Sequence, residues 1–303
     1  MTDRRIIEIH ERPARVRFDT GCLVLEHGTG ENTASTSVAV RDVDALILSH
    51  PQISISGAAL SAVAEAGGIV VISGDDALPR GMLLPFGHHH APARRLAAQA
   101  AATQPVLKRL WAEIVSEKIR GQAVVLARNG EEAGHLFGLA NNVRSGDPDN
   151  IEGQAARYYW LRLFDDGFVR DREAPDANRL LNYGYAILRA FVTRALCAAG
   201  LHPGLGLHHH HRNNPFPLAD DVMEPFRPVV DQEVVALVEA AGHRQPLDGA
   251  TRRRLVAVIA RNEFNFGKEK CVPAEYITQL AQRLAKVFED ERKDMGVEGL
   301  WHP

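Results

Sequence analysis

The chain has 303 residues, of which 45% are hydrophobic and 24% are charged, and these ordinary globular values exclude a disordered protein. The formal net charge of −3 excludes a protein that coats nucleic acid through overall basicity, so any DNA contact must come from a local basic patch. No apolar run is long enough to cross a bilayer and the first residues lack a signal-peptide core, so we expect a cytoplasmic protein with no membrane partner.

Residues 1–87 carry the pattern of a small β-rich domain. Apolar residues alternate or cluster in short stretches between turn residues, which is typical of strands. One helix interrupts them, with Ser56 as its candidate N-cap and Gly67 and Gly68 as its end. We find no candidate catalytic residue in this domain. The predicted strands are 6–9, 14–18, 22–25, 37–40, 45–48, 69–73 and 81–85.

The pattern changes after residue 87. Residues 88–94 are predicted to form a linker. Its histidines, His88 to His90, are better explained as linker residues than as metal ligands, because no carboxylate lies close in sequence. From Ala93 to Leu126 apolar residues recur at helical spacing, with a break at Pro105. Further helices are predicted at 151–161, 178–198, 229–241, 251–261 and 273–293. The fold class is therefore α+β: a small N-terminal β-rich domain followed by a larger all-helical C-terminal domain at 95–303.

The stretch from Gly200 to Pro228 carries the strongest chemical signal. Four consecutive histidines, His208–His211, lie in a loop punctuated by glycine and proline, and Asp221 and Glu224 follow at the start of a predicted helix. Residues three apart on a helix project from the same face. Imidazole and carboxylate groups that converge form a plausible Mg²⁺ or Mn²⁺ site. The alternative is a solvated loop whose histidines have no function.

A third ligand has to come from elsewhere, and Glu152 is the candidate. It follows the candidate caps Asp149 and Asn150 and lies at the end of a mostly apolar helix stripe. Glu152 is either a first-turn carboxylate that the helix dipole favours or a ligand that points inward, and spacing alone leaves both interpretations open. Carboxylate-rich sites with one imidazole suit metal ions that activate water or a hydroxyl for phosphoryl transfer.

Other cofactor sites are not indicated. Cys22, Cys197 and Cys271 are widely spaced and lack CxxC spacing, which argues against a structural zinc site or a disulfide framework. The sequence also has no Walker-type loop and no dinucleotide fingerprint.

A run of three arginines, 252–254, lies on a predicted helix. Such a run is more often a solvated face than a binding site. With Arg261, Lys268 and Lys270 it could instead form a stripe that contacts phosphates.

Four segments, in this order, resemble the family of CRISPR-associated protein one. They are EGQAARYYW at 152–160, LNYGY at 181–185, the loop at 200–211 and ADDVMEPFRP at 219–228. The likeness covers essentially the whole chain, including the β-then-helical layout. The apolar pattern around Lys118 is also similar to that of the subtype found beside a single large effector nuclease.

The resemblance implies the adaptation integrase that inserts new spacers into CRISPR arrays. In such an enzyme, a DNA 3′-hydroxyl attacks a phosphodiester of the repeat in a Mg²⁺- or Mn²⁺-dependent transesterification. The β domain would serve dimerisation and the helical domain would hold the metal. The implied partners are a second copy of the chain, double-stranded DNA, CRISPR-associated protein two as a small bridging subunit, and the effector nuclease.

By the same resemblance, the catalytic metal ligands carry over to Glu152, His209 and Glu224, with Asp221 as an accessory acid. Glu224 stands where many members have aspartate, and His209 is assigned by counting three residues from Gly206. The arginines expected to contact the DNA backbone are Arg157, Arg212, Arg252, Arg253 and Arg261.

Two alternative functions use the same residues. A stand-alone nuclease would use the same metal ligands with water as the nucleophile. A non-catalytic scaffold would only hold DNA ends, and it would tolerate the loss of Glu152.

Overall fold

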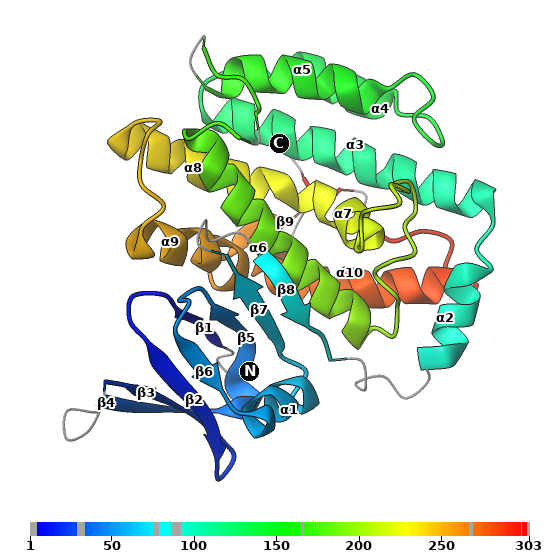
Figure 1. Cartoon of the computed structure of the whole chain (residues 1–303). Helices are drawn as coiled ribbons and strands as arrows, with labels where there is room; N and C mark the ends of the chain where they lie inside the picture. Colours follow the sequence, from blue (N-terminus) through cyan, green and yellow to red (C-terminus); the bar gives the residue numbers. More distant parts are fainter. Residues whose placement is uncertain are drawn as a thin grey trace. The chain divides into compact units, whose positions relative to one another are not determined.

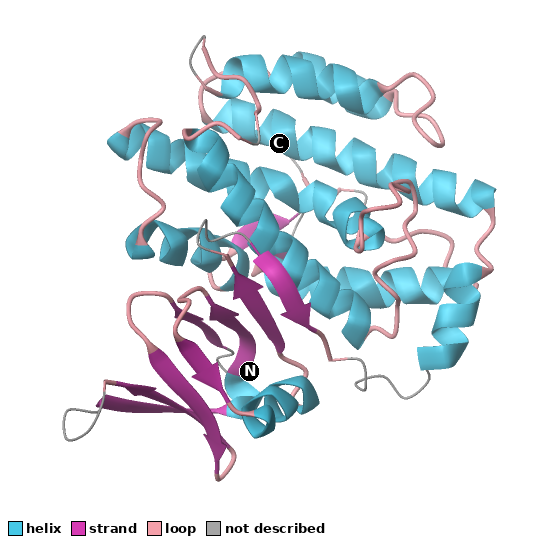
Figure 2. Ribbon diagram, in the orientation of Figure 1, coloured by secondary structure: helices cyan, strands magenta, loops and turns pink. Residues whose placement is uncertain are grey.

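The computed structural model describes residues 5–28, 34–74, 79–85, 92–164, 167–171, 173–266, 269–297 and 299–301. The chain divides into two units, residues 1–90 and 91–303. Figure 2 shows mainly strands in the first unit and mainly helices in the second, as the α+β prediction requires. The predicted linker histidines 88–90 lie outside the described residues, and residues 92–94 already belong to helix α2 (Pro92–Ala100).

In its described residues, the first unit contains two four-stranded sheets. Its strands are β1 (Arg5–Ile9), β2 (Ala14–Asp19), β3 (Cys22–His27), β4 (Ala34–Ala39), β5 (Val43–Leu48), β6 (Ile53–Ile55), β7 (Ile69–Ser73) and β8 (Pro79–Leu83). One sheet has the order β1-β5-β7-β8 and the other β4-β3-β2-β6. β1, β5 and β7 are parallel and β8 is antiparallel, whereas β2 pairs antiparallel with β3 and parallel with β6.

One core lies inside this unit, and helix α1 (Gly57–Glu65) covers part of it. Buried Val16 and Leu23 from one sheet, Leu46 from the other and Val63 from α1 belong to a single apolar cluster. The predicted cap at Ser56 is confirmed, because its hydroxyl accepts a hydrogen bond from the Ala59 amide at 3.2 Å. Strand β6 was not predicted, since three residues are too short to show an alternation.

The second unit is a helical assembly. Its helices, besides α2, are α3 (Gln104–Arg128), α4 (Gly134–Asn141), α5 (Ile151–Leu163), α6 (Ala177–Ala198), α7 (Pro217–Met223), α8 (Arg227–Ala241), α9 (Gly249–Ala260) and α10 (Pro273–Phe288), with a 3₁₀ turn, η3 (Glu224–Phe226). Figure 1 shows α5 running alongside α3, with α7 and α8 on the other side of α3. Helix α6 contacts α7, α8, α9 and α10.

Helix α6 is central, as its apolar sequence predicts. Most of its side chains are buried, and Gly184 lets α8 approach closely. A Cβ atom added at Gly184 would lie 2.4 Å from Cγ1 of Val230 on α8, which is closer than real contacts allow. The glycine is therefore required by helix packing.

The helical unit differs from the prediction in three details. Helix α4 was not predicted. A hairpin of β9 (Phe264–Phe266) and β10 (Glu269–Cys271) interrupts the helices, so the unit is not wholly helical. The last helix ends at Phe288 instead of residue 293, because Asp290 adopts a left-handed conformation with φ of 58°. The Glu291 amide then bonds the Lys286 carbonyl at 2.8 Å, which is the pattern of a Schellman C-cap.

Candidate functional site

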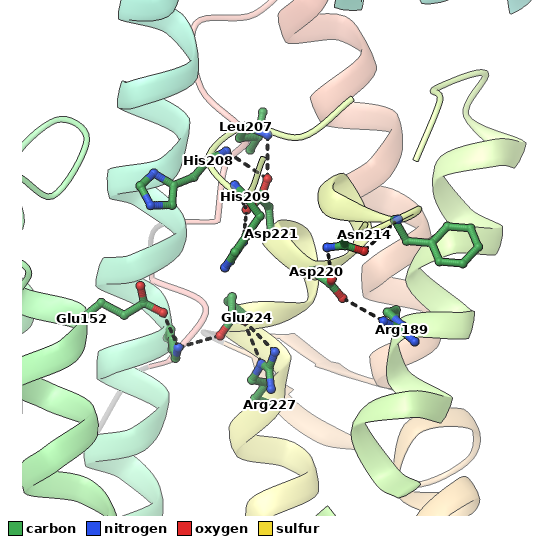
Figure 3. A network of polar contacts seen from close by, with 12 residues as sticks. Glu152, Arg189, Leu207, His208, His209, Asn214, Asp220, Asp221, Glu224 and Arg227 are labelled. Carbon is green, nitrogen blue, oxygen red and sulfur yellow. Dashed lines mark hydrogen bonds and ion pairs between the residues drawn. The ribbon is translucent and has the colours of Figure 1, made fainter. Parts of the chain in front are cut away.

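Three segments of the helical unit bring together the residues predicted to bind metal. Glu152 comes from α5, His209 from the loop before α7, and Glu224 from η3, and Figure 3 shows the three side chains facing the same space. The ammonium of Lys118, on α3, lies between the two carboxylates. Its Nζ is 2.5 Å from Glu152 Oε1 and 2.6 Å from Glu224 Oε2.

The start of α5 sets the position of Glu152. Asn150 is the N-cap, and its side chain accepts a hydrogen bond from the Gly153 amide at 3.2 Å. Asp147 accepts from the amides of Ile151 and Glu152 at 2.8 and 3.0 Å. These bonds satisfy the free amides of the first turn. Glu152 is a first-turn carboxylate, as one interpretation requires, and its side chain also points toward Lys118 on α3, with which it pairs. Its role as a metal ligand stays a prediction.

Asp221 organises the histidine loop. Its carboxylate is fully buried and accepts hydrogen bonds from the amides of Leu207, His208 and His209 at 2.6, 3.1 and 3.2 Å. It also bonds Nδ1 of His209 at 2.6 Å. Gly206 allows this close approach, since a Cβ there would lie 2.6 Å from the His209 carbonyl and 3.1 Å from the Asp221 carboxylate. Asp221 therefore positions His209 and does not face the space between Glu152 and Glu224.

The four histidines differ in their surroundings. His209 is the one bonded to Asp221, and this contact raises its pKa above the ordinary value. The ring of His208 stacks on Trp111, with centroids 4.3 Å apart and an interplanar angle of 2°. The ring of His211 accepts a long hydrogen bond from the Asn213 amide at 3.4 Å. Because Nδ1 of His209 is engaged by a carboxylate, its Nε2 is the nitrogen left to face the site.

Glu224 is buried between two cations. Its side chain is 4% exposed, Arg227 lies 2.9 Å from Oε1, and Lys118 faces Oε2. Burial alone would raise the pKa of Glu224, but the charges of Arg227 and Lys118 outweigh burial and hold the pKa at about 2. The carboxylate is thus ionised at neutral pH. The indole of Trp301 donates to the carbonyl of the next residue, Pro225, at 2.8 Å, which fixes the backbone there.

Lys118 is charged although it is buried. Burial alone would lower its pKa, but the charges of Glu224 and Glu152 outweigh burial and raise it. Spacing on the predicted helix could have indicated this residue, since Lys118 lies seven positions after buried Trp111 and four after buried Ile114, on the inward face of α3.

A second polar network supports the turn before α7. Asn214 donates to Asp220 at 2.7 Å and accepts from the Phe216 amide at 3.0 Å. Arg189 of α6 lies 3.6 Å from Asp220 (Figure 3). This network ties the histidine loop to α6.

A cavity of about 250 Å³ adjoins the site. Lys118, Glu224 and Arg227 line it together with Gln122, Ala156, Trp160, Arg170, Tyr185 and Asp231. Buried Asp231 accepts hydrogen bonds from the hydroxyls of Tyr159, at 2.9 Å, and Tyr185. Burial raises the pKa of Asp231 to about 6, although both hydrogen bonds act in the opposite direction. Sequence reasoning did not identify this acid.

The side chains present fit a divalent cation by their chemistry. Two carboxylates and an imidazole oriented by a carboxylate form a donor set that Mg²⁺ or Mn²⁺ accepts. Oε2 of Glu224 is buried, and it pairs with the ammonium of Lys118 at 2.6 Å. Within the described residues, no three His, Cys, Asp or Glu side chains are gathered closely enough to hold one ion. The ammonium of Lys118 holds the intervening position.

The structure does not place all the predicted DNA-binding arginines near this site. Arg157 is exposed on α5 and Arg212 is exposed in the histidine loop, so both belong to segments that build it. Arg252 and Arg253 lie on α9 and Arg261 follows it. Helix α9 packs against α6, α8 and α10, on a different side of the unit from α5 (Figure 1).

The chain matches a known family and proteins of known fold. A family model described as CRISPR associated protein Cas1 matches residues 7–246. The CRISPR-associated endonuclease Cas1 of Neisseria meningitidis serogroup C is 38% identical over 231 residues, which are 76% of this chain and 76% of that protein.

Two solved structures share the fold of this chain. A casposase bound to integration product superposes with a TM-score of 0.80 at 17% identity, over 98% of this chain and 94% of that one. A chain of a Cas6-RT-Cas1–Cas2 complex superposes with a TM-score of 0.77 at 19% identity, over 99% of this chain and 36% of the longer one. In the part of the chain that the structure describes, no helix is long and apolar enough to span a membrane.

Proposed function

Because this chain belongs to the CRISPR associated protein Cas1 family, we propose that it is the integrase of CRISPR adaptation, which joins spacer DNA to the CRISPR repeat. The observation that carries the proposal is that Glu152 and Glu224 meet at one cationic position, the ammonium of Lys118, and that the side chain of His209 faces the same space. The names of similar proteins support it: one relative is an endonuclease, and one structure of the same fold is a casposase bound to integration product.

The proposed cofactor is Mg²⁺ or Mn²⁺, held by Glu152, His209 and Glu224. When bound, it would supply the positive charge that stabilises the transition state of phosphoryl transfer. Asp221 holds the imidazole of His209 by Nδ1, so that Nε2 presents its lone pair to the site. Arg227 holds Glu224 by Oε1, which leaves Oε2 turned inward. Asp221 is therefore a positioning residue in this proposal.

The proposed reaction exchanges one phosphodiester for another. The 3′-hydroxyl of the spacer strand gives up its proton and its oxygen bonds to phosphorus of the repeat, the phosphorus bond to the leaving 3′-oxygen breaks, and that oxygen takes up a proton. The number of phosphodiester bonds is unchanged, so the reaction needs no nucleoside triphosphate as an energy source. The basic groups of Lys118 and Arg227 favour the approach of the phosphate.

The proposed partners follow the family. They are a second copy of this chain joined through domain 1–87, double-stranded DNA, a small bridging subunit such as the one named in the Cas6-RT-Cas1–Cas2 complex, and an effector nuclease. Arg157 and Arg212 are the better placed of the proposed DNA contacts, with Arg252, Arg253 and Arg261 on the α9 side. The proposed location is the cytoplasm.

An integration assay tests this function. The protein, with and without its small partner, is mixed with a short duplex and a supercoiled plasmid that carries the repeat, in Mg²⁺ or Mn²⁺. Joining is measured for wild type and for Glu152→Ala, His209→Ala and Glu224→Ala, with His210→Ala as the matched control. Even outer-shell partners of a metal ligand cost 10–100-fold, so we expect each ligand variant to lose joining by at least ~100-fold.

Each result has a clear meaning. Joining by wild type and His210→Ala, lost in the three ligand variants, supports both the reaction and its site. Cutting without joining, even with the partner present, would favour the stand-alone nuclease. Full joining by Glu224→Ala would show that the metal site lies elsewhere, and DNA binding with neither cutting nor joining would favour the scaffold.

A further inference from the structure

We propose that Lys118 is a resident cation of the site: its ammonium takes the position of the divalent ion between Glu152 and Glu224, and moves to Gln122 when the ion binds. This inference rests on the proposed function in one respect, since it takes Glu152 and Glu224 as metal ligands. It adds a residue that the predicted ligand set does not contain.

The contacts of Lys118 are those of an ion held between two carboxylates. Its Nζ is 2.5 Å from Glu152 and 2.6 Å from Glu224, and the lysine side chain is 12% exposed. It projects from the middle of α3, whose 25 residues pack against α5 and α8. The helix is thus fixed by its neighbours, whereas the four-carbon side chain can rotate.

An ammonium and a metal ion cannot share this position. Divalent Mg²⁺ takes its oxygen ligands at ~2.0–2.1 Å, so an ion that bridges Glu152 and Glu224 would occupy the volume of Nζ. Two positive charges a few ångströms apart in a buried site also repel strongly. The lysine must therefore leave before both carboxylates can ligate the ion.

The structure contains an acceptor for the displaced amine. Gln122 lies one helical turn beyond Lys118 on the same face of α3, and both line the cavity of about 250 Å³. Gln122 is 4% exposed, and its Oε1 is buried without a hydrogen-bond partner. Buried carbonyl oxygens are normally paired, so this one needs an explanation. The Lys118 ammonium, turned into the cavity, would satisfy it.

Arg227 is not the displaced cation. It contacts Glu224 on the other oxygen, Oε1, and no ion pair joins it to Glu152 among the described residues. Its guanidinium lies 4.6 Å from the ring centroid of Tyr185, where stacking holds it. Arg227 therefore serves as a matched control for the loss of one positive charge.

A double-mutant cycle on Mn²⁺ affinity tests the proposal, with the full-length protein titrated by calorimetry. Lys118→Met removes the competing charge at similar length, so we expect Mn²⁺ to bind roughly tenfold more tightly or better. Gln122→Leu removes the acceptor of the displaced ammonium, and a hydrogen bond to a charged group is worth enough to weaken binding roughly tenfold. In the Lys118→Met background, Gln122→Leu should have no effect.

The dependence of the Gln122 effect on Lys118 distinguishes movement from simple electrostatics. Arg227→Met is expected to change Mn²⁺ affinity while leaving the tenfold effect of Gln122→Leu intact. Equal effects of Gln122→Leu with and without Lys118, or no effect in either, would overturn the proposal. So would unchanged or weaker binding in Lys118→Met.

Failure of the inference and failure of the proposed function are separable. Glu224→Ala identifies binding at this site, because it should abolish the Mn²⁺ isotherm. Identical isotherms for wild type and Glu224→Ala would overturn the metal site and the inference together. If Mn²⁺ binding were lost in Glu224→Ala but its affinity were unchanged in Lys118→Met and Gln122→Leu, only the inference would be overturned.

Discussion

Asp221 and Glu224 are three residues apart, yet the structure gives their carboxylates different tasks. Asp221 is enclosed by three backbone amides and the imidazole of His209, all of which donate to it. The carboxylate of Glu224 is paired with two cations, Lys118 and Arg227. The first carboxylate builds the loop, and in our proposal the second becomes a ligand of the metal ion once Lys118 moves.

Replacing Asp221 by asparagine tests this division. The amide nitrogen of asparagine cannot accept from the loop amides, so buried donors are left unpaired, at a cost of about 1–3 kcal/mol in the free energy of unfolding. Urea denaturation measures the loss. Asp220→Asn is the matched control, since Asp220 is partly exposed and accepts mainly from Asn214, and it should cost less. Equal losses in the two variants would contradict the role given to Asp221.

Asp231 predicts a pH dependence of stability. Its pKa is about 6 in the folded protein, against an ordinary value of 3.8. Between these values the folded protein keeps a proton that the unfolded chain has released, so the contribution of Asp231 to stability falls as the pH rises from about 4 to about 6 and is constant above. The shift corresponds to a change on the order of 3 kcal/mol.

Comparison with Asp231→Asn isolates this contribution. Asparagine does not titrate, so the unfolding free energy of wild type relative to the variant should decrease across that pH range. Chemical denaturation at several pH values measures the difference. Parallel profiles would show that Asp231 has an ordinary pKa.

At the scale of the elements, the close packing of α6 against α8 helps to position Glu224. Helix α8 begins at Arg227, directly after the 3₁₀ turn that carries Glu224. Gly184→Ala would place a Cβ 2.4 Å from Val230, which is buried and branched at Cβ and so has little room to turn. We expect a loss of about 1–3 kcal/mol, as for other overpacked cores. Thermal or urea unfolding would measure it.

Two variants check the cause of that loss. Val230→Ala in the Gly184→Ala background removes the clashing atoms and should recover part of the stability. Gly138→Ala in α4 has no atom within 4 Å of the added Cβ, so it should stabilise by about 0.5–1 kcal/mol through helix propensity. If Gly184→Ala stabilised the protein instead, α8 would be able to shift and accept the added Cβ atom at little cost in free energy.

At the scale of the whole molecule, the chain consists of two units that each bury their own apolar side chains. Val16 and Leu46 lie in the core of the first unit, and Trp111, Tyr159 and Phe226 are fully buried in the second. A unit with its own core is expected to fold alone. Residues 92–303 expressed separately should therefore show a helical circular dichroism spectrum and one cooperative thermal transition.

The full-length chain is the control for that fragment. If residues 92–303 gave no cooperative transition while the full chain did, the helical unit would depend on the first unit for its stability. A fragment that unfolds cooperatively and still binds Mn²⁺ would place the whole metal site in the second unit.

The sequence by itself determined the fold class and the family. The spacing of apolar residues distinguished strands from helices, because the repeat of about two residues in a strand or 3.6 in a helix appears within a short stretch of sequence. The motifs around Glu152, His209 and Glu224 carried the family resemblance, which the family match confirms. The hairpin at Phe264 was not predicted, because strands of three residues are too short to show an alternation of apolar and polar residues.

Only the tertiary structure decided how the site is built. Lys118 precedes Glu152 by 34 residues, and nothing in the local pattern of α3 states which side chains of α5 and η3 it meets. Likewise, His208 and His209 are neighbours in sequence but face Trp111 and Asp221, respectively. The α9 arginines, grouped with Arg157 by charge, lie on another side of the unit. Charge and spacing are local properties, whereas contacts between side chains depend on how separate helices pack.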